Sequence, residues 1–169
     1  MVRFRKICLK YPKDQLIVNI DGKVAVITGE ASGLGKAAAE RIIAKGNRVA
    51  VFDLNKDLAD RTAAELMKAK SYEVDMTDDN SVIRAIKAVK SDFGSIRINV
   101  NCAGVGASSR TVGSDGAMDI NKFNFIVEVN LIGTFSVLSK CAAIMQLNNP
   151  EGETLEKGVI INTASVAAF

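Results

Sequence analysis

The amino-acid sequence predicts an α/β domain in which a parallel sheet lies between two layers of helices. Short apolar runs rich in β-branched residues alternate five times with longer helical segments along the chain. These runs are continuously apolar rather than alternating, which is typical of strands buried on both faces of a parallel sheet. The chain of 169 residues is long enough for one domain with a substantial core.

The first half of the chain carries three of the expected strands. The apolar run KVAVIT follows a turn at Asp21 and Gly22, and RVAVFD follows Gly46, which ends an alanine-rich helix at the C′ position. The expected elements are a strand over 23–28, a glycine-rich turn over 29–35, a helix over 36–45, a strand over 48–53, a helix over 56–69 and a strand over 71–75.

In the second half of the chain, predicted strands and helices alternate in the same way, but the segments are longer. Asp78 is expected to begin a helix that ends near Gly94, and Pro150 lies in a polar loop after the longest apolar helix. The expected elements are a helix over 78–93, a strand over 96–101, a loop over 104–118, a helix over 121–147, a loop over 148–157 and a strand over 158–163. Because crossovers between parallel strands are right-handed, these elements predict a doubly wound, three-layer α/β/α fold of the Rossmann type.

The composition excludes several classes of function. The absence of histidine excludes Ser-His-Asp and Cys-His catalysis and every histidine metal site. The three cysteines lie far apart, so the sequence predicts no metal site, no disulfide framework and a reducing compartment. Residues 21–169 hold 17 of the 22 basic and 18 of the 19 acidic residues, so no nucleic-acid surface is expected. No membrane span is expected either, because Glu128, Asn130 and Lys140 interrupt the apolar stretch 125–147.

We divide the chain into a basic N-terminal extension, residues 1–20, and a nucleotide-binding domain, residues 21–169. The extension holds five basic residues and one acid, and a helix would separate its apolar side chains from its basic ones. This pattern is typical of a mitochondrial transit peptide, although the segment has no serine and contains Pro12. A disordered basic extension or a mis-called start codon is the alternative, and the location would then be cytoplasmic.

The glycine-rich turn TGEASGLG follows a predicted strand and opens a predicted helix. Glycines in this context allow a tight turn and a close approach of the backbone to a pyrophosphate. The free N–H groups and the dipole at the helix start stabilise the phosphate charge. We therefore predict a dinucleotide site to which this turn contributes Thr28, Gly29, Ser32, Gly33, Leu34 and Gly35.

Asp53 ends the second predicted strand, 18 residues after Gly35. A carboxylate at this place accepts hydrogen bonds from both adenosine ribose hydroxyls and repels a 2′-phosphate. The turn before Gly35 contains no arginine or lysine, and Glu30 adds a second negative charge there. These features favour NAD over NADP. A plain strand end or a helix cap is the alternative interpretation of Asp53.

Together with this turn, three further motifs make the sequence similar to the short-chain dehydrogenase/reductase family. They are Asp75 in VDMT, NCAG over 101–104 and Asn130 in VNL, and INTAS over 161–165 matches the family's catalytic-serine strand. The resemblance covers residues 22–169. Within the family, the stretches VNCAG, VNLIGTF and GVIINTASVAAF are similar to the 3-hydroxyacyl-CoA dehydrogenase type 2 subfamily, which also acts as 17β-hydroxysteroid dehydrogenase 10.

The resemblance implies further cofactor contacts. Asp75 would accept a hydrogen bond from the adenine edge. Asn101, Ala103 and Gly104 would line the nicotinamide ribose side and stabilise the central sheet. Cys102 stands where the family more often has a second asparagine, and a small buried residue is expected there rather than a nucleophile.

The resemblance also implies two catalytic residues, Ser165 and Asn130. Ser165 would bond the substrate oxygen and Asn130 would hold a water of the proton relay; an ordinary strand-end serine and a buried polar residue are the alternatives. The family's general acid/base is a tyrosine with a lysine four residues later, shortly past the serine. This sequence ends at Phe169 without that pair, and Tyr11 and Tyr72 lie elsewhere. We therefore expect a domain that is incomplete on its C-terminal side and inactive alone.

The resemblance thus predicts an NAD-dependent oxidoreductase that oxidises the 3-hydroxyl of 3-hydroxyacyl-CoA, or of hydroxysteroids, by hydride transfer. The expected partners are an acyl-CoA or steroid substrate and further copies of the chain, because the family forms tetramers and the helix over 121–147 is apolar nearly all round. Two alternatives remain open. One is a non-catalytic NAD-binding or assembly subunit, as in mitochondrial tRNA processing, and the other is a 3-ketoacyl reductase of the same family.

Overall fold

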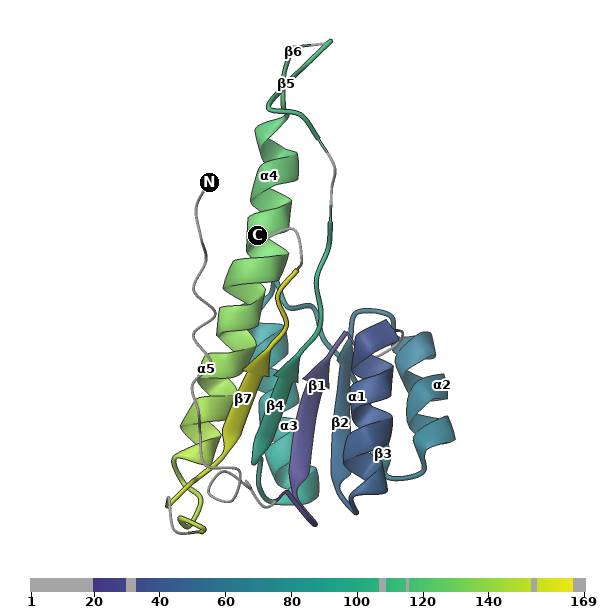
Figure 1. Ribbon diagram of the computed structural model, residues 1–169, viewed down its shortest axis with the longest axis vertical. Coiled ribbons are helices and arrows are strands. Elements are labelled where there is room, and N and C mark those ends of the chain that lie inside the picture. Colours follow the sequence, from purple (N-terminus) through teal and green to yellow (C-terminus); the bar gives the residue numbers. More distant parts are fainter. Residues whose placement is uncertain (1–19, 30–32, 107–108, 115, 153–154, 166–169) are drawn as a thin grey trace, which may run out of the picture.

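The computed structural model describes residues 20–29, 33–106, 109–114, 116–152 and 155–165, and it confirms the doubly wound parallel sheet (Figure 1). The sheet has the strand order β3-β2-β1-β4-β7, and all neighbouring pairs are parallel. Its strands are β1 (Val24–Thr28), β2 (Arg48–Asp53), β3 (Ala69–Glu73), β4 (Ile98–Asn101) and β7 (Val159–Asn162). Nearly all of the predicted extension, residues 1–19, lies outside the described residues.

Helices cover both faces of this sheet, as the sequence predicts. They are α1 (Gly33–Ala44), α2 (Lys56–Leu66), α3 (Asp79–Phe93), α4 (Ile120–Val127), the π-helical segment η1 (Glu128–Gly133) and α5 (Thr134–Met145). Alternate residues of the strands point to opposite faces. Ala25 and Ile27 belong to a core cluster with α1 and α2, whereas Val24 and Val26 belong to a second cluster with α3 and α5. The result is the predicted three-layer α/β/α arrangement.

Several predicted bounds are displaced. α1 begins at Gly33 rather than at Lys36, because the last part of the glycine-rich turn is already helical. β3 covers 69–73 rather than 71–75. The reason is a sharp turn at Met67, whose φ is 54°, after which the Lys68 carbonyl accepts a hydrogen bond from the Val49 N–H and pairing with β2 begins. The predicted loop 104–118 contains a short hairpin of β5 (Val112–Gly113) and β6 (Gly116–Ala117).

The helix predicted over 121–147 is one long helix with a π-helical interruption. By length and composition alone, Ile120–Met145 is apolar enough to cross a membrane. Its second half, however, packs on the sheet: Val137 and Cys141 are fully buried in the core. Its first half extends past the sheet, with the β5–β6 hairpin at its far end (Figure 1). α5 is therefore a core helix of the α/β layers.

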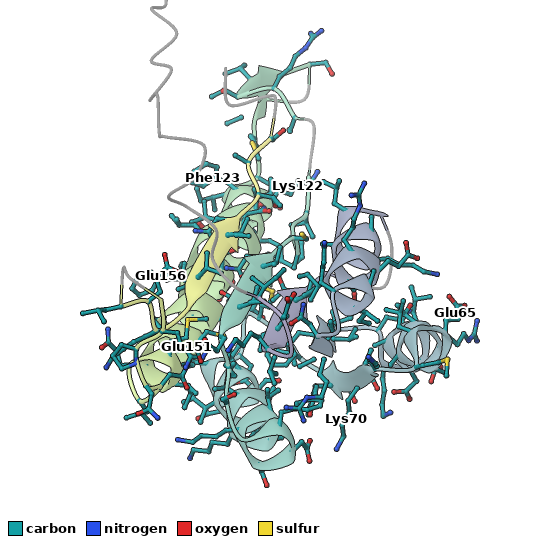
Figure 2. The ribbon with its side chains drawn as sticks, turned by 60° about the horizontal axis from the view of Figure 1, so that its bottom comes forward. Glu65, Lys70, Lys122, Phe123, Glu151 and Glu156 are labelled. Atoms are coloured by element: carbon teal, nitrogen blue, oxygen red, sulfur yellow. The ribbon has the colours of Figure 1, made fainter. Side chains whose placement is uncertain are left out.

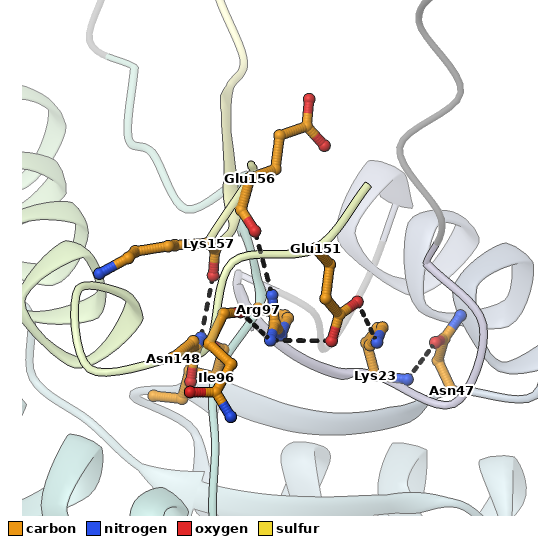
Figure 3. Close-up of polar contacts among 9 residues, drawn as sticks. Lys23, Asn47, Ile96, Arg97, Asn148, Glu151, Glu156 and Lys157 are labelled. Carbon is orange, nitrogen blue, oxygen red and sulfur yellow. Dashed lines mark hydrogen bonds and ion pairs between the residues drawn. The ribbon is translucent and has the colours of Figure 1, made fainter. Parts of the chain in front are cut away.

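A polar network closes the end of the sheet at which the strands begin (Figure 3). Arg97, which precedes β4, donates to the carbonyl of Asn149 at 2.7 Å and pairs with Glu151 at 2.8 Å. Glu151 also binds Lys23 Nζ at 2.5 Å, next to the start of β1. Asn148 Nδ2 donates to the carbonyls of Ile96 and Lys157. These contacts hold the loop that leads into β7 against the strands β1 and β4.

The two described cysteines differ in environment, which gives a prediction for their reactivity. Burial raises the pKa of the Cys141 thiol to about 12, and the thiolate is the species that reacts with alkylating reagents. In a Cys8→Ser variant at pH 8, we expect iodoacetamide to modify the half-buried Cys102 and to spare Cys141 until urea unfolds the chain. Mass spectrometry of the digested protein measures both. Equal alkylation of the two thiols in the folded state would show that α5 does not pack as described.

Candidate functional site

A cavity of about 500 Å³ opens at the edge of the sheet where the strands end. Its described walls come from the ends of β1, β2, β3 and β4, the start of α1 and the first part of the long helix. They include Gly29, Leu34, Gly35, Asp53, Leu54, Asp75, Met76, Thr77, Ala103, Gly104, Val105, Phe125 and Val129. In sheets of this topology, ligands bind at this edge, where the connections from neighbouring strands leave in opposite directions. Here that point lies between β1 and β4.

The glycine turn forms one wall of the cavity, and Gly29 is its most constrained residue. Gly29 has a φ of +67°, and its N–H donates to the carbonyl of Phe52 at 3.0 Å. A Cβ atom at this position would lie 2.6 Å from the Cα of Ala103. Only glycine allows both the left-handed conformation and this contact. Gly33 begins α1 with a φ of +62°, and a Cβ atom there would meet nothing within 4 Å.

Thr28 holds the loop after β4 in place below the cavity. Its side chain is completely buried, and its Oγ1 accepts hydrogen bonds from the N–H groups of Cys102 at 3.2 Å and Ala103 at 3.1 Å. The carbonyl of Thr28 accepts a second contact from Cys102 at 3.2 Å. Thr28 therefore holds the backbone of Cys102 and Ala103 beside Gly29.

A matched pair of substitutions tests this function of Thr28. Thr28→Val keeps the shape but leaves the half-buried Ala103 N–H without its acceptor, so we expect a loss of about 2 kcal/mol in the free energy of unfolding. Thr28→Ser keeps both hydrogen bonds and removes one methyl group, which costs about 1 kcal/mol. Urea titrations measure both. A serine variant that loses as much stability as the valine variant would mean that packing, not the two hydrogen bonds, explains Thr28.

Two carboxylates line the cavity: Asp53 at the end of β2 and Asp75 shortly after β3. Asp53 Oδ1 accepts a hydrogen bond from the Asn55 N–H at 2.9 Å. Asp75 Oδ1 accepts from the side chain of Thr77 at 2.7 Å and from its N–H at 2.8 Å, and these bonds lower the pKa of Asp75. Among the described residues that line the cavity, these two acids are accompanied by no lysine or arginine. This wall therefore favours hydrogen-bond donors and disfavours anions.

Asn130 lies in the π-helical segment and ties the long helix to the loop after β4. Its Nδ2 donates to the carbonyls of Val105 and Ile126, each at 2.8 Å, and its Oδ1 accepts from the Val105 N–H at 3.1 Å. Gly104 permits this approach, since a Cβ there would lie 2.7 Å from Asn130 Oδ1. Single π-helical turns inside α-helices are frequent at functional sites, where they expose carbonyls that an α-helix would use internally.

The structure brings together most, but not all, of the residues that the sequence predicts for the site. Gly29, Leu34, Gly35, Asp53, Asp75, Ala103 and Gly104 line the cavity. Thr28 and Asn101 are buried beneath it, Gly33 begins α1, and Asn130 contacts its rim through Val105. Ser165 follows β7 and is exposed, outside the described lining of this cavity. Ser32 lies outside the described residues.

Sequence reasoning missed the contribution of the long helix to the cavity. Phe125 and Val129, four residues apart on this helix, both line the cavity. The only signal for them was their spacing of four residues, directly before Asn130, and an apolar pair of this kind is indistinguishable from an ordinary core contact. Leu54 and Thr77, each shortly after a strand end, were also missed.

Tyr72, one of the two tyrosines of the sequence, is unsuited to act as a general base. It lies on β3, where its ring packs edge-on against Phe52 with 5.7 Å between the ring centres, and its hydroxyl donates to Asp92 at 2.6 Å. Burial, and then the hydrogen bond to Asp92, raise the pKa of Tyr72 well above its usual range. Its hydroxyl therefore stays protonated and bound to a carboxylate. Tyr11 lies outside the described residues.

Comparisons with known proteins agree with this geometry. Residues 23–169 match the family model described as short chain dehydrogenase. Over 154 residues the chain is 39% identical to 3-hydroxyacyl-CoA dehydrogenase type-2 of Bos taurus and 38% identical to that of Homo sapiens, and in each case the match covers 89% of this chain and 59% of the relative. The chain therefore spans about three-fifths of the length of these relatives.

Two solved structures are also similar to this chain over most of its length. The crystal structure of 3-hydroxyacyl-CoA dehydrogenase type-2 from Mycobacterium avium superposes with a TM-score of 0.81 at 31% identity, covering 90% of this chain and 61% of that one. The 3-ketoacyl-(acyl-carrier-protein) reductase from Brucella melitensis, solved in complex with NADH, superposes with a TM-score of 0.78 at 33% identity, covering 88% and 59%.

Proposed function

Because the chain belongs to the short-chain dehydrogenase family, we propose that it forms the NAD-binding part of an oxidoreductase acting on 3-hydroxyacyl-CoA thioesters. The similarity to 3-hydroxyacyl-CoA dehydrogenases supports this substrate class, with hydroxysteroids as further substrates. The NADH complex of a related reductase supports a nicotinamide dinucleotide as the cofactor. We also propose a mitochondrial location, with residues 1–20 as the transit segment.

The observation that carries the proposal is the convergence of the glycine turn, Asp53, Asp75 and the 103–104 loop on one cavity. A dinucleotide needs a backbone that a phosphate can approach, and the start of α1, where Leu34 and Gly35 line the cavity, offers one. It also needs acceptors for the adenosine end, which Asp53 and Asp75 provide. The residues present therefore fit NAD.

The charge of the cavity wall favours NAD over NADP. Asp53 would accept hydrogen bonds from the two adenosine ribose hydroxyls, and a 2′-phosphate at that place would lie against its carboxylate. NADP-binding sites of this fold commonly place an arginine near this phosphate. The described cavity lining has two acids and no base, so a 2′-phosphate would find no counter-charge there.

The other predicted residues would act around the nicotinamide end of the cofactor. Bound NAD supplies the hydride acceptor for oxidation of a secondary alcohol. Ala103 and Gly104 would contact the nicotinamide ribose, and Ser165 would donate a hydrogen bond to the substrate oxygen. Asn130 would keep the Val105 segment against the helix and offer a place for a water of the proton relay. The 169-residue sequence contains no Tyr-x-x-x-Lys pair, so we propose that this chain binds NAD without appreciable turnover.

Titration with reduced cofactors tests the proposal. We expect NADH to bind the purified chain at least ten times more tightly than NADPH, because a 2′-phosphate next to Asp53 costs more than about 1.4 kcal/mol. Enhancement of nicotinamide fluorescence measures both dissociation constants, and 3-hydroxybutyryl-CoA with NAD measures turnover in the same preparation. Failure of both cofactors to bind would overturn the proposal, and rapid turnover would overturn the claim that the chain lacks its acid/base.

The exposed apolar side chains of the long helix favour association between copies of the chain. Leu131 is 65% exposed and Phe135 is 63% exposed on η1 and α5. Figure 2 shows Phe123 next to Lys122 on α4, far from Glu65 and Lys70 at the other side of the molecule. Exposed aromatic and aliphatic side chains that lie along one helix are typical of protein interfaces. We propose that copies of the chain associate through this helix, and sedimentation of wild type against Phe135→Glu tests this.

A further inference from the structure

Three asparagine side chains form a ladder of amides across the middle of the sheet. Asn99 Nδ2 donates to the Val26 carbonyl on β1 at 3.3 Å and to Asn101 Oδ1 at 3.1 Å. Asn101 Nδ2 donates back to Asn99 Oδ1 at 2.9 Å and onward to Asn162 Oδ1 on β7 at 2.8 Å. Asn99 is 0% exposed and Asn101 is 3% exposed. The ladder therefore joins β1, β4 and β7 through two buried side chains on β4 and the exposed Asn162 on β7, in addition to the backbone.

Asn99 determines which way the amide of Asn101 faces. The two side chains exchange two hydrogen bonds, one in each direction, so each fixes the position of the oxygen and the nitrogen in the other. If the Asn101 amide were reversed, its oxygen would face the oxygens of both Asn99 and Asn162. Two acceptors opposed in a buried site are unfavourable, because neither has a donor. Asn99 thus makes Asn101 a donor toward β7.

Strand β7 is expected to depend on the Asn101 side-chain donor more strongly than a strand in the interior of the sheet would. Among the described residues, β4 is its one strand neighbour, through four residue pairs, and Ile161 is 48% exposed. Asn101 makes three hydrogen bonds to β7 and the residue after it: its side chain donates to Asn162, and its carbonyl accepts from the Thr163 N–H at 3.1 Å and from Thr163 Oγ1 at 2.9 Å. The segment after Thr163 leads directly to Ser165.

We propose that Asn99 is a positioning residue of the site, acting through Asn101 on the placement of β7 and of the Ser165 segment. Asn99 lies outside the described lining of the nucleotide cavity and on the strand next to β7. Its side chain is polar although the position is buried, and an apolar side chain there would avoid the free-energy cost of burying an amide. The catalytic role of Ser165 in this proposal rests on the proposed function, whereas the effect of Asn99 on β7 does not depend on that function.

Residue-resolved hydrogen exchange of the full chain tests the effect on β7. In Asn99→Leu, which keeps the size but not the amide, we expect exchange of the Val159 and Thr163 N–H groups to rise about tenfold. Exchange in β1 and β2 should stay within about twofold of wild type. The matched control is Ile98→Val, the neighbour on β4 that packs on the opposite face of the sheet, which should change all strands alike. Equal changes in β2 and β7 of Asn99→Leu would overturn the proposal.

A second variant keeps the test valid if Asn99→Leu does not fold. Asn162→Leu changes an exposed residue of the edge strand and removes only the last step of the ladder. We expect it to raise exchange at Val159 and Thr163 as much as Asn99→Leu does, and the double variant to add less than a further threefold. Unchanged exchange in Asn162→Leu, or fully multiplicative effects, would overturn the proposal. NADH affinity, measured separately, distinguishes this outcome from a failure of the proposed cofactor site.

Discussion

Replacing Gly29 by alanine is expected to destabilise the protein by about 3 kcal/mol or more and to abolish NADH binding. The φ of +67° places a non-glycine residue in the left-handed region, which costs about 1–2 kcal/mol. The new Cβ would also lie 2.6 Å from Ala103 Cα and 2.7 Å from its nitrogen, both backbone atoms. The loop that carries Ala103 and Gly104 must therefore move away from β1, which opens the cavity on its cofactor side.

Gly46→Ala is the matched control for this substitution. Gly46 also has a positive φ, +83°, but a Cβ there would meet nothing within 4 Å, and it lies away from the cavity. We expect this variant to lose only the conformational part, about 1 kcal/mol, and to bind NADH normally. Urea unfolding and nicotinamide fluorescence measure both variants. If the two glycine variants lose the same stability, the contact between Gly29 and Ala103 contributes nothing and our account of the turn is wrong.

The reason for Gly29 shows what the sequence could and could not predict. The pattern of glycines after KVAVIT correctly placed the connection between β1 and α1. The sequence argument assigned these glycines to the approach of a pyrophosphate, whereas in the structure Gly29 makes room for the backbone of Ala103. That contact joins residues 74 positions apart, and no local pattern reports it. Gly29 is thus constrained by a contact within the fold, although the sequence pattern predicted it as part of a cofactor-binding turn.

β1 and β2 were predictable because burial on both faces makes most of their residues apolar, whereas β3, at the edge of the sheet, is polar and its bounds were predicted two residues too late. The long helix was predicted only in outline. Its apolar composition indicated a helix over 121–147, but the π-helical segment around Asn130 has no signature of period or capping. The three hydrogen bonds of Asn130, two of them to Val105, become visible only when the loop after β4 lies against the helix. The same holds for Asn99, which reads as an ordinary polar residue until Asn101 and Asn162 are placed beside it.

Removing the charge of Asp53 is expected to reduce the preference for NADH over NADPH by about 100-fold. Asp53→Asn keeps an oxygen that can accept from the Asn55 N–H, so the end of β2 stays intact. The variant loses charge-assisted hydrogen bonds to the ribose hydroxyls, which should weaken NADH binding about tenfold. It also loses the repulsion of a 2′-phosphate, which should strengthen NADPH binding by a similar factor. Fluorescence titrations of both cofactors at low and high salt measure the change.

The control for Asp53→Asn removes the same charge from the neighbouring strand. Glu73 pairs in register with Asp53 across β2 and β3, but it lies outside the described lining of the nucleotide cavity. Glu73→Gln should therefore change the ratio of the two dissociation constants by less than threefold, and this small change should vanish at high salt, where distant charges are screened. A shift of equal size in both variants would mean that the net charge of this edge, rather than a hydrogen bond from the ribose to Asp53, sets the preference. A shift confined to Asp53→Asn and retained at high salt requires direct contact between that carboxylate and the adenosine end of the cofactor.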